Sequence, residues 1–372
     1  MKRTIKVLHI ANMMKGGGVA SFLMNYFRHI DRSEILFDFV SEDLHIDTYE
    51  EEINNLGGKL YIVPHYKNNF WGYIKALDKI IKPDVYDTVH CHEFVLSIIA
   101  LFISRKNKIR FRYSHSHSYA VRGGLFSIII KKILVFLSHP FFRLLSTRCF
   151  ACSEDAGRYL FGNTSNFEII HNAIYVEKYL FNKHLRTKIR SSLNISDTAL
   201  LLGYVARFDK QKNHIFLIKV FSKILEKKND AMLLLVGSGT DYQTIHDMIT
   251  AYNIAEKVIF YGISDNVSEL YSAMDVFVFP SLAEGLGIVG IEAQCSGLPV
   301  IASSNIPKMM QVSNLVTWLN LNDSIDEWAD KVINCSLKTE RKDMSEVITS
   351  AGYNISFESK KLEQIYLQNN IF

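Results

Sequence analysis

The sequence predicts an α/β fold built from two doubly wound parallel sheets. Short, continuously apolar runs alternate with longer helical segments along the chain, as expected for strands buried on both faces of a parallel sheet. The alternation starts again near residue 199, after a polar stretch. The chain has 372 residues, 48% of them hydrophobic, which is enough for two cores of ordinary size. We therefore expect βαβ units in each half, with helices on both faces of each sheet.

The strands are predicted from these apolar runs. In the first half they are 5–11, 36–40, 60–63, 88–92, 109–114, 149–152 and 167–171. In the second half they are 200–206, 232–236, 258–261, 276–279 and 300–302. Ligands of open α/β sheets bind at the carboxyl ends of the strands, so functional residues are sought in the loops that follow them.

The domain boundary is predicted from composition. A polar helical stretch at 178–192 and the segment "NISDTA" resemble a linker, so the hinge falls between Asn172 and Ser196. We expect an N-terminal domain at 1–180, a C-terminal domain at 181–355 and a closing helix at 356–372. The apolar positions of that helix recur at helical spacing.

The net charge of the chain is less informative than the distribution of its charged residues. The net charge of +4 is only mildly basic and does not indicate nucleic-acid binding. Residues 94–153 contain ten Lys or Arg and no Asp or Glu. This segment is either a basic surface of one domain or a contact for an anion such as a diphosphate or a phospholipid surface.

One long apolar segment lies inside this basic region. Residues 125–145 carry Lys131, Lys132 and Arg143, which argue against a membrane-spanning helix. The segment fits either a basic helix lying on a membrane surface or an internal helix. The N-terminal "MKRTIKVLHIANMM" fits a first strand better than a signal peptide, because Lys6 interrupts the apolar run.

The cysteines predict a reduced, intracellular protein. There are five, an odd number without the spacing of a disulfide framework. Cys149 and Cys152 form an isolated CxxC inside an apolar run, where packing is favoured over redox chemistry.

Two glycine loops follow predicted strands. Gly16, Gly17 and Gly18 open a helix after the first strand, but they do not match the GxGxxG spacing of a dinucleotide site. They permit either a ligand close to the backbone or a plain tight turn. Gly237, in "LVGSG", lies at another turn of this kind.

A basic pair follows the strand at 200–206, in "RFDKQKNH". Arg207 lies at the strand end and Lys212 at the start of the next helix. An Arg fork and a mobile Lys ammonium could converge on a diphosphate. A solvated turn explains these two residues equally well.

The stretch "SLAEGLGIVGIEAQCSG" at 281–297 joins carboxylates to a glycine-rich turn. Pro280 ends a strand, and a helix is predicted at 288–295, stopped by Gly297 and Pro299. Its N-terminus offers free amides and the positive end of the helix dipole to an anion. Glu284 and Glu292 are acceptors suited to the vicinal diols of a sugar and a ribose. The alternative is that both glutamates pair with Arg207 and Lys212.

These segments resemble the retaining glycosyltransferases of family 4, with the GT-B fold, over nearly the whole chain. "SLAEGLGIVGIEAQCSGLPVIAS" is similar to the family's E-x7-E region, and "VARFDKQKNH" to its Arg…Lys diphosphate motif. "ELYSAMDVFVFPS", "ACSEDAGRYLFG", "IIHNAI", "RYSHSHS" and "KGGG" also look like family segments, especially those of the capsule and exopolysaccharide branch. The resemblance implies two Rossmann-like domains facing each other across a cleft, with a C-terminal helix crossing back.

Site residues follow from the resemblance, position by position. His117, Glu284, Arg207 and Lys212 would act in catalysis, with His117 on the acceptor side. The implied donor-binding residues are Gly17, Gly18, Arg207, Lys212, Gly237, Glu284, Gly285, Leu286, Gly287, Ile288 and Glu292. Two positions depart from the family: Tyr175 stands where Asp is frequent, and Leu286 where Phe is common.

The reaction implied is transfer of a hexose or N-acetylhexosamine from a nucleoside-diphosphate sugar, with uridine expected as the base, to an acceptor hydroxyl. The anomeric configuration would be retained, and the leaving phosphate would take the acceptor's proton. Arg207, Lys212 and the helix N-terminus would stabilise the departing diphosphate without a metal or other cofactor. The H-x-H pairs His90/His92 and His115/His117 could together supply four zinc ligands, but the flanking basic residues disfavour a cation there.

The expected partners are the nucleotide sugar and a glycan or polyprenyl-diphosphate-linked acceptor, without nucleic acid. The expected location is cytoplasmic, with peripheral contact at the anionic inner face of the membrane through the basic stretch. The alternatives are a nucleotide-sugar epimerase or phosphorylase on the same fold, a retaining hydrolase using the two glutamates, and a non-catalytic partner subunit.

Overall fold

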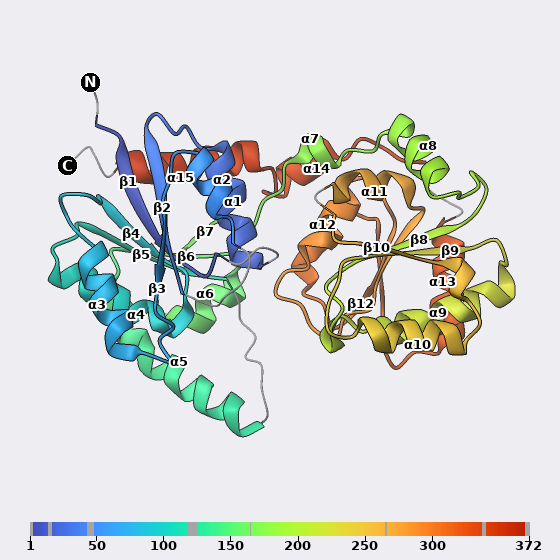
Figure 1. Ribbon diagram of the computed structural model, residues 1–372, viewed down its shortest axis with the longest axis horizontal. Coiled ribbons are helices and arrows are strands. Elements are labelled where there is room, and N and C mark those ends of the chain that lie inside the picture. The colour runs from blue at the N-terminus through green and yellow to red at the C-terminus, as the bar shows by residue number, and fades with distance from the viewer. Residues whose placement is uncertain are drawn as a thin grey trace. The chain divides into compact units, whose positions relative to one another are not determined.

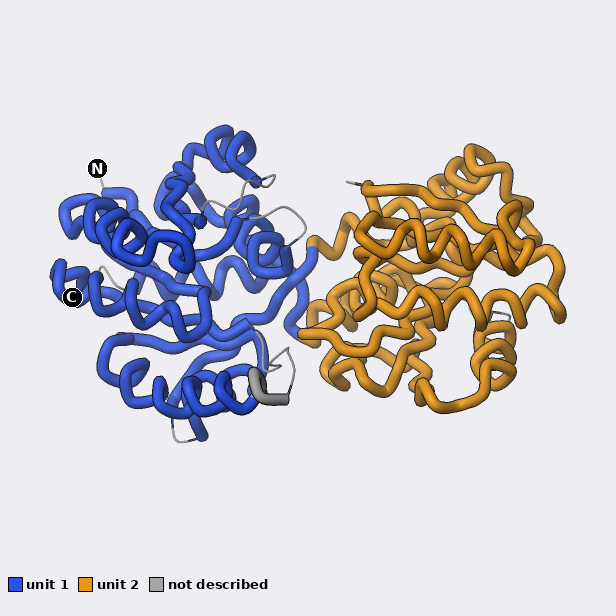
Figure 2. The backbone as a smooth tube through the Cα atoms, turned by 60° about the horizontal axis from the view of Figure 1, so that its bottom comes forward, with its two compact units in different colours: residues 1–174, 352–372 blue, residues 175–351 orange. Residues whose placement is uncertain are grey.

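The computed structural model describes residues 3–13, 17–42, 48–117, 125–163, 165–264, 266–336 and 340–368. The chain divides into two compact units: unit 1 comprises residues 1–174 and 352–372, and unit 2 comprises residues 175–351 (Figure 2). Each unit contains one parallel sheet with helices on both faces (Figure 1). The predicted α/β class with two doubly wound sheets is therefore confirmed.

Unit 1 is built on a seven-stranded parallel sheet in the order β3-β2-β1-β4-β5-β6-β7. The strands are β1 (Ile5–Ile10), β2 (Ile35–Glu42), β3 (Leu60–Val63), β4 (Thr88–Cys91), β5 (Phe111–Ser116), β6 (Arg148–Ala151) and β7 (Glu168–Ile169). Strand β5 begins two residues later than predicted, so His115 lies within the strand and His117 directly follows it.

The helices of unit 1 cover two separate cores, one on each face of the sheet (Figure 1). One face carries α1 (Gly18–His29), α2 (Glu50–Asn55) and the C-terminal α15 (Ile355–Gln368); the other carries α3 (Phe70–Ile80), α4 (Ser97–Lys106), α5 (Leu125–Leu145) and α6 (Glu154–Phe161). Successive residues of a strand point to opposite faces, so Val7 lies in the first core and Leu8 in the second. The predicted closing helix is thus α15, which packs in unit 1.

Two expectations for unit 1 concern α5 and the CxxC pair. Among the described residues, no helix combines the length and apolar character needed to cross a membrane. Burial raises the pKa of the Cys149 and Cys152 thiols to about 11, which keeps both protonated at neutral pH and fits packing better than redox chemistry.

Unit 2 is built on a six-stranded parallel sheet in the order β10-β9-β8-β11-β12-β13. The strands are β8 (Leu201–Val205), β9 (Met232–Val236), β10 (Val258–Gly262), β11 (Val276–Phe279), β12 (Val300–Ser303) and β13 (Val316–Leu319). Strand β13 was not predicted. It is a four-residue edge strand whose middle residues, Thr317 and Trp318, are only partly buried, so its apolar signal is short.

The helices of unit 2 also form two layers (Figure 1). One layer contains α9 (His214–Lys227), α10 (Tyr242–Ala251) and α13 (Ile325–Ser336); the other contains α7 (Val176–Tyr179), α8 (Lys183–Ser192), α11 (Val267–Ala273), α12 (Ile288–Cys295) and α14 (Ser345–Ser350). The single helix expected at 178–192 is wrong: it is split into α7 and α8, because the Asn182 side chain caps α8 by accepting the Leu185 N–H.

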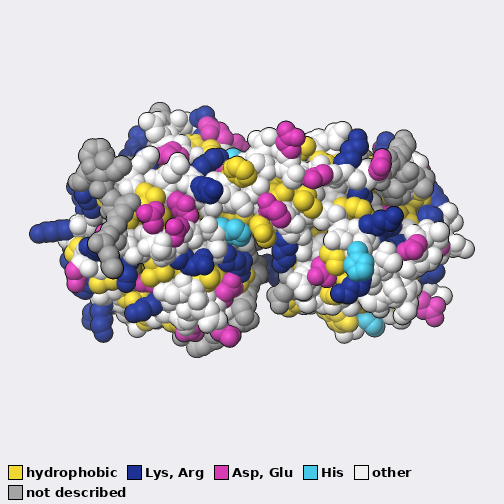
Figure 3. Space-filling view, turned by 90° about the horizontal axis from the view of Figure 1, so that it is seen from above, with side chains coloured by type: hydrophobic (Ala, Val, Ile, Leu, Met, Phe, Trp, Pro, Cys, Tyr) yellow, Lys and Arg dark blue, Asp and Glu magenta, His cyan; other side chains and the backbone are white. Residues whose placement is uncertain are grey.

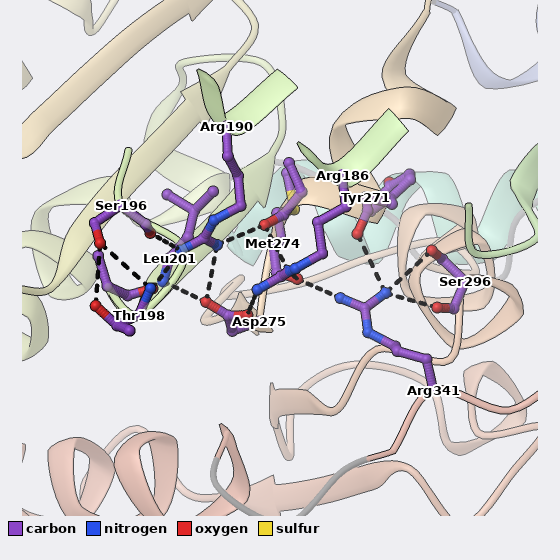
Figure 4. A network of polar contacts seen from close by, with 12 residues as sticks. Arg186, Arg190, Ser196, Thr198, Leu201, Tyr271, Met274, Asp275, Ser296 and Arg341 are labelled. Atoms are coloured by element: carbon purple, nitrogen blue, oxygen red, sulfur yellow. Dashed lines mark hydrogen bonds and ion pairs between the residues drawn. The ribbon is translucent and has the colours of Figure 1, made fainter. Parts of the chain in front are cut away.

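A buried charge network holds α8 against the start of β11 (Figure 4). Asp275 accepts hydrogen bonds from Arg186 at 2.6 Å, Arg190 at 3.2 Å and the Leu201 N–H at 2.7 Å. Arg190 is fully buried and also donates to the carbonyls of Ala273 and Ala199. The network therefore joins the α8 segment to the amino ends of both β8 and β11.

Charges of both signs are interspersed on the face shown in Figure 3, as the small net charge of +4 suggests.

The strand orders place a topological switch point in each sheet. In unit 1, β1 is flanked by β2 and β4, and in unit 2, β8 is flanked by β9 and β11. Crevices for ligands open at the carboxyl ends of the strands at such points. The loops after β8 and β11, and the histidines on β1 and β4, therefore lie where a doubly wound fold binds its ligands.

Candidate active site

The loops after β8 and β11 are tied together by hydrogen bonds. The Leu282 N–H donates to the Gln211 carbonyl at 2.8 Å, and the Asn213 side chain donates to the Pro280 carbonyl at 3.1 Å. Below them, the buried Tyr204 hydroxyl contacts both the Lys212 carbonyl and the Ser281 hydroxyl. The switch point of unit 2 is thus lined by two loops of fixed relative geometry.

Lys212 and Glu284 meet across these loops. The Lys212 ammonium lies 2.7 Å and 2.8 Å from the two carboxylate oxygens of Glu284. The exposed fractions of the two side chains are 21% and 9%, so the pair is partly shielded from water. The 3₁₀ turn Lys210–Lys212 positions the lysine, because the Asp209 carboxylate caps it by accepting the Lys212 N–H at 3.2 Å.

Arg207 has a more exposed setting. Its Nε donates to the Asp209 carboxylate at 2.9 Å, and its side chain is 61% exposed. Burial opposes ionisation of the Asp209 carboxyl, but Arg207 and the Lys212 N–H hold its pKa below the usual value. Both predicted cations therefore carry a carboxylate partner, Asp209 for Arg207 and Glu284 for Lys212.

Helix α12 begins directly after the Glu284 loop, at the residue predicted. Gly287 is its N-cap with φ +83°, a left-handed conformation that favours glycine. A Cβ at Gly287 would also lie 3.1 Å from the Phe279 ring. The first turn contains no acidic residue, so its unpaired amides and the positive helix end remain suited to an anion. Leu286 and Ile288 flank this N-cap, and Gly285 precedes it.

Glu292 has partners that the sequence did not reveal. Its carboxylate accepts hydrogen bonds from Tyr271 of α11 at 2.9 Å and Tyr179 of α7 at 3.1 Å. Burial raises the pKa of Glu292, and the two tyrosines partly offset that rise. Glu284 pairs with Lys212, as the alternative of pairing with a basic side chain expected, whereas the hydrogen bonds to Glu292 come from two tyrosines. Tyr271 lies within a family-like segment, which was the one available signal for it.

Gly237 is required by the backbone around it. Its φ is +135°, and a Cβ there would lie 2.1 Å from the Ala206 carbonyl oxygen. Its N–H donates to the Gly262 carbonyl at 2.8 Å. Gly237 thus allows the β9 loop to approach the end of β8, where Arg207 begins.

The remaining predicted site residues belong to unit 1. Gly17 is the N-cap of α1 and Gly18 its first residue, while Gly16 lies outside the described residues. A Cβ at Gly18 would meet no described atom within 4 Å, so the backbone there is open to approach.

Imidazole rings from β1, β4 and β5 form a cluster at the switch point of unit 1. His9 Nδ1 lies 3.0 Å from His92 Nε2, and His92 Nδ1 lies 2.8 Å from His117 Nε2. His90 Nδ1 contacts the Tyr366 hydroxyl at 2.7 Å, and the His115 ring stacks on His117 with centroids 4.1 Å apart. The sequence singled out the H-x-H pairs but missed His9, which joins them from the neighbouring strand.

Burial keeps these histidines neutral. Desolvation lowers the pKa of His9 and His117 to about 3 and places the pKa values of His90, His92 and His115 well below the usual range. The sets His9/His90/His92 and His92/His115/His117 each bring one ring nitrogen per residue within 4.8 Å of the others, close enough to be weighed as metal ligands. The nitrogens at 3.0 Å and 2.8 Å are at hydrogen-bond distance and can share protons directly.

Together, the unit 2 residues can bind an anion and a polyol side by side. A lysine ammonium has three N–H donors, so Lys212 can bind both Glu284 oxygens and still donate to an oxyanion. Arg207 likewise has donors beyond the Nε that binds Asp209. With the α12 amides, these groups offer several hydrogen-bond donors to an anion such as a phosphate pair.

Comparisons with known proteins identify the family of the chain. Residues 186–352 match the family described as Glycosyl transferases group 1. The chain is 33% identical over 375 residues to the putative glycosyltransferase EpsF of Bacillus subtilis, covering 97% of this chain and 96% of that protein. It is 26% identical over 316 residues to an Escherichia coli UDP-Gal:alpha-D-GlcNAc-diphosphoundecaprenol alpha-1,3-galactosyltransferase, covering 78% of each.

A solved structure gives the same fold. Anabaena Alr3699/HepE, crystallised with UDP and glucose, superposes with a TM-score of 0.75 at 16% identity, covering 98% of this chain and 100% of that one. The fold and site thus define a GT-B glycosyltransferase. The chain belongs to the group 1 glycosyltransferases, and the resemblance inferred from its motifs is confirmed.

Proposed function

We propose that the chain is a retaining glycosyltransferase that uses a nucleoside-diphosphate sugar, expected to be a UDP-sugar. It transfers a hexose or N-acetylhexosamine to a hydroxyl of a glycan or polyprenyl-diphosphate-linked acceptor in surface polysaccharide synthesis. The observation that carries the proposal is the Lys212–Glu284 pair in the loops at the switch point of unit 2. The names of the relatives support it, since one acts with UDP-Gal on a diphosphoundecaprenol-linked sugar.

The donor is held by groups of matched chemistry. The diphosphate accepts hydrogen bonds from the third Lys212 N–H, from Arg207 and from the amides around Gly287 and Ile288. Glu284 accepts from hydroxyls of the sugar, and Glu292 accepts from the ribose diol, sharing its carboxylate with Tyr271 and Tyr179. Gly285, Leu286 and Gly237 contribute backbone close to the donor.

Bond breaking places negative charge on the diphosphate. Lys212, Arg207 and the N-terminal end of α12 stabilise that charge without reorganisation, because they are already held by Asp209, Glu284 and the loop hydrogen bonds. The leaving phosphate takes the acceptor's proton on the same face, which retains the configuration. In unit 1, Gly17 and Gly18 give a ligand access to the backbone, and His117 contacts the reacting sugar or its acceptor.

The test is donor binding by the purified chain. A nucleotide sugar present at 100 times its Kd should stabilise the protein by about 2.7 kcal/mol. A thermal-shift panel of UDP-, GDP- and dTDP-sugars identifies the base. Glu292→Ala should reduce the shift, whereas Glu226→Ala, at a glutamate that is 60% exposed, should keep it. A panel in which no nucleotide sugar stabilises the wild-type chain would refute the proposal.

Product analysis then separates the alternatives. With an acceptor present, a transferase gives a longer glycan, whereas an epimerase gives an isomeric nucleotide sugar without any acceptor. A non-catalytic partner subunit gives neither product.

A further inference from the structure

Helix α5 exposes an unusually apolar surface on unit 1. The side chains of Ile133, Leu134, Phe136, Leu137, Phe141 and Leu144 are between 51% and 71% exposed. Val135, Phe142 and Leu145 of the same helix are buried in unit 1, so the exposed residues are a second apolar face and not the packing face. At about 100° per residue, the exposed apolar positions span an arc of roughly 160°.

Neighbouring helices extend this surface. Trp71 of α3 is 71% exposed and Phe102 of α4 is 61% exposed. With Phe141 and Leu144 they line an open groove of about 1000 Å³ between α3, α4 and α5. We call this combined surface the α3–α5 face; it comprises the groove and the exposed apolar residues of α5. Apolar patches of this size mark a binding surface.

The charge around the α3–α5 face is basic. Lys75, Arg105 and Lys106 line the groove, and Lys132 is exposed on α5. Asp78 also lines it, where its carboxylate pairs with Lys106 at 3.1 Å. The segment 94–153, which contains α4 and α5, contributes ten basic residues and no acidic one. An anionic partner is therefore favoured over a neutral or basic one.

We propose that the α3–α5 face docks the protein on an anionic phospholipid bilayer. The apolar residues of α5 enter the boundary between headgroups and acyl chains, the groove receives an acyl chain, and the lysines and arginines contact lipid phosphates. The interaction is separate from donor binding, because the α3–α5 face contains none of the proposed donor residues. It would bring the enzyme to the surface where a polyprenyl-linked acceptor resides.

The test is co-sedimentation of the full chain with phosphatidylglycerol/phosphatidylcholine vesicles. Wild type should bind, and binding should weaken with added salt. Phe136→Asp with Leu137→Asp should reduce binding at least tenfold, while Ile263→Asp, at an apolar side chain of unit 2 that is 79% exposed, should not. Lys75→Glu with Lys132→Glu should reduce binding by at least about 30-fold, because the loss of each lysine costs about 1 kcal/mol and each new glutamate is repelled by the lipid phosphates. Lys188→Glu with Lys219→Glu is the control of equal charge change.

Three outcomes would overturn the proposal. Equal binding to pure phosphatidylcholine vesicles would exclude an anionic partner. Unchanged binding by the α5 variants would place the contact elsewhere. Lipid-independent dimers that the Phe136→Asp, Leu137→Asp variant disrupts would assign the face to a second copy of the chain. A thermal shift with the nucleotide sugar, measured on the same variants, reports the donor site separately.

A second inference comes independently from the histidine cluster. We infer that His9 and His92 are positioning residues that fix which ring nitrogen of His117 carries its proton. Its relevance to catalysis rests on the proposed function. Each neutral ring has one donor and one acceptor nitrogen, so the two contacts in series must run in one direction.

The direction of donation follows from His9, the ring at the buried end of the series. His9 Nε2 is buried without a hydrogen-bond partner among the described residues. A buried N–H left unpaired is rarer than an unpaired acceptor, so Nε2 holds the lone pair and Nδ1 the proton. His9 then donates to His92, and His92 donates to His117 Nε2. The proton of His117 therefore lies on Nδ1, which makes no hydrogen bond to a described residue. His117 presents a donor to its ligand and does not act as a base.

Nitrogen NMR of ¹⁵N-histidine-labelled protein at pH 7.5 tests the inference without substrate. His117 should show the Nδ1–H tautomer, while the exposed His246 should show the mixture of a solvated ring. His92→Phe should return His117 to a mixture, and His92→Gln, which keeps a side-chain donor, should restore the tautomer in part. An Nε2–H tautomer of His117 in the wild type, or no change in His92→Phe, would overturn the inference. The spectrum is recorded without substrate, so a failure of the proposed transferase function would leave its result unchanged.

Discussion

Lys212 and Glu284, 72 residues apart in the sequence, form a two-pronged ion pair of 2.7 Å and 2.8 Å between the loops after β8 and β11. The pair places a partly shielded ammonium at the switch point of unit 2, and Glu284 lies three residues before Gly287, the N-cap of α12. A donor diphosphate bound there meets the ammonium and the helix amides together, while the carboxylate remains for sugar hydroxyls.

The Lys212 ammonium should contribute mainly to the bond-breaking step. Lys212→Ala removes a donor to the leaving diphosphate, and loss of one such preorganised donor typically lowers kcat by about 10²–10³-fold. Steady-state kinetics with a UDP-sugar and acceptor measure the effect. Lys219→Ala, on the surface of α9, is the matched control. Wild-type turnover in Lys212→Ala would contradict the assigned role.

Glu292 should contribute to donor affinity. Glu292→Gln weakens the acceptor for a ribose diol, and a hydrogen bond to a charged group is worth about 1.5–3 kcal/mol, so the Kd should rise by roughly 10–150-fold. Isothermal titration with UDP measures this, because UDP carries the ribose without the sugar. Glu226→Gln, at a side chain that is 60% exposed, serves as the control. An unchanged Kd for UDP would remove Glu292 from the ribose site.

Unit 1 should lose stability in acid through its buried histidines. In the folded state the pKa of His9 is about 3, below the ordinary value of 6.5, so between these values the unfolded chain binds more protons than the folded one. Stability should therefore be full above about pH 6.5 and fall as the pH drops toward 3. Each such histidine contributes a slope of about 1.4 kcal/mol per pH unit.

Urea denaturation between pH 7.5 and 4.5 checks this slope. His9→Gln should reduce the slope by about 1.4 kcal/mol per pH unit, the contribution of one histidine. His9 faces His90 of β4, His92 directly after that strand and Tyr366 of α15, so the change is read as a difference between variants and not as an isolated titration. Parallel curves for wild type and His9→Gln would show that His9 does not titrate on unfolding.

Asp275 should be important for the stability of unit 2. Asp275→Ala removes the carboxylate that pairs with Arg186 and with the fully buried Arg190. Breaking such a pair leaves a buried cation uncompensated, at a cost of about 3–5 kcal/mol. Chemical denaturation of the variant measures the loss. Asp230→Ala, at a carboxylate that is 45% exposed, should cost less than about 1 kcal/mol. Equal stability of the two variants would contradict the network's role.

The sequence predicted local features well and long-range ones poorly. The bounds of α12 were predicted because Pro280, Gly297 and Pro299 are local signals for the ends of elements. Strand β13 was missed because its edge position leaves only a short apolar pattern. The two tyrosines on Glu292 could not be predicted, since Tyr179 is 113 residues away and nothing local indicates that its hydroxyl reaches the carboxylate.

The site residues show the same contrast between local features, which were predicted, and long-range contacts, which were not. Arg207, Lys212 and Glu284 were identified by residue type and by resemblance, yet which cation pairs with which carboxylate depends on the order β8-β11 in the sheet. His9 was missed for a similar reason. It lies on β1, and only the pairing of His9 with His90 across neighbouring strands brings it to the H-x-H pairs.

A crystal structure of the chain with bound UDP tests the central claim most directly. We predict that the β-phosphate lies within hydrogen-bond distance of the Lys212 ammonium and the amides of Gly287 or Ile288, with the ribose at Glu292. Phosphates bound away from both Lys212 and the start of α12 would contradict the account.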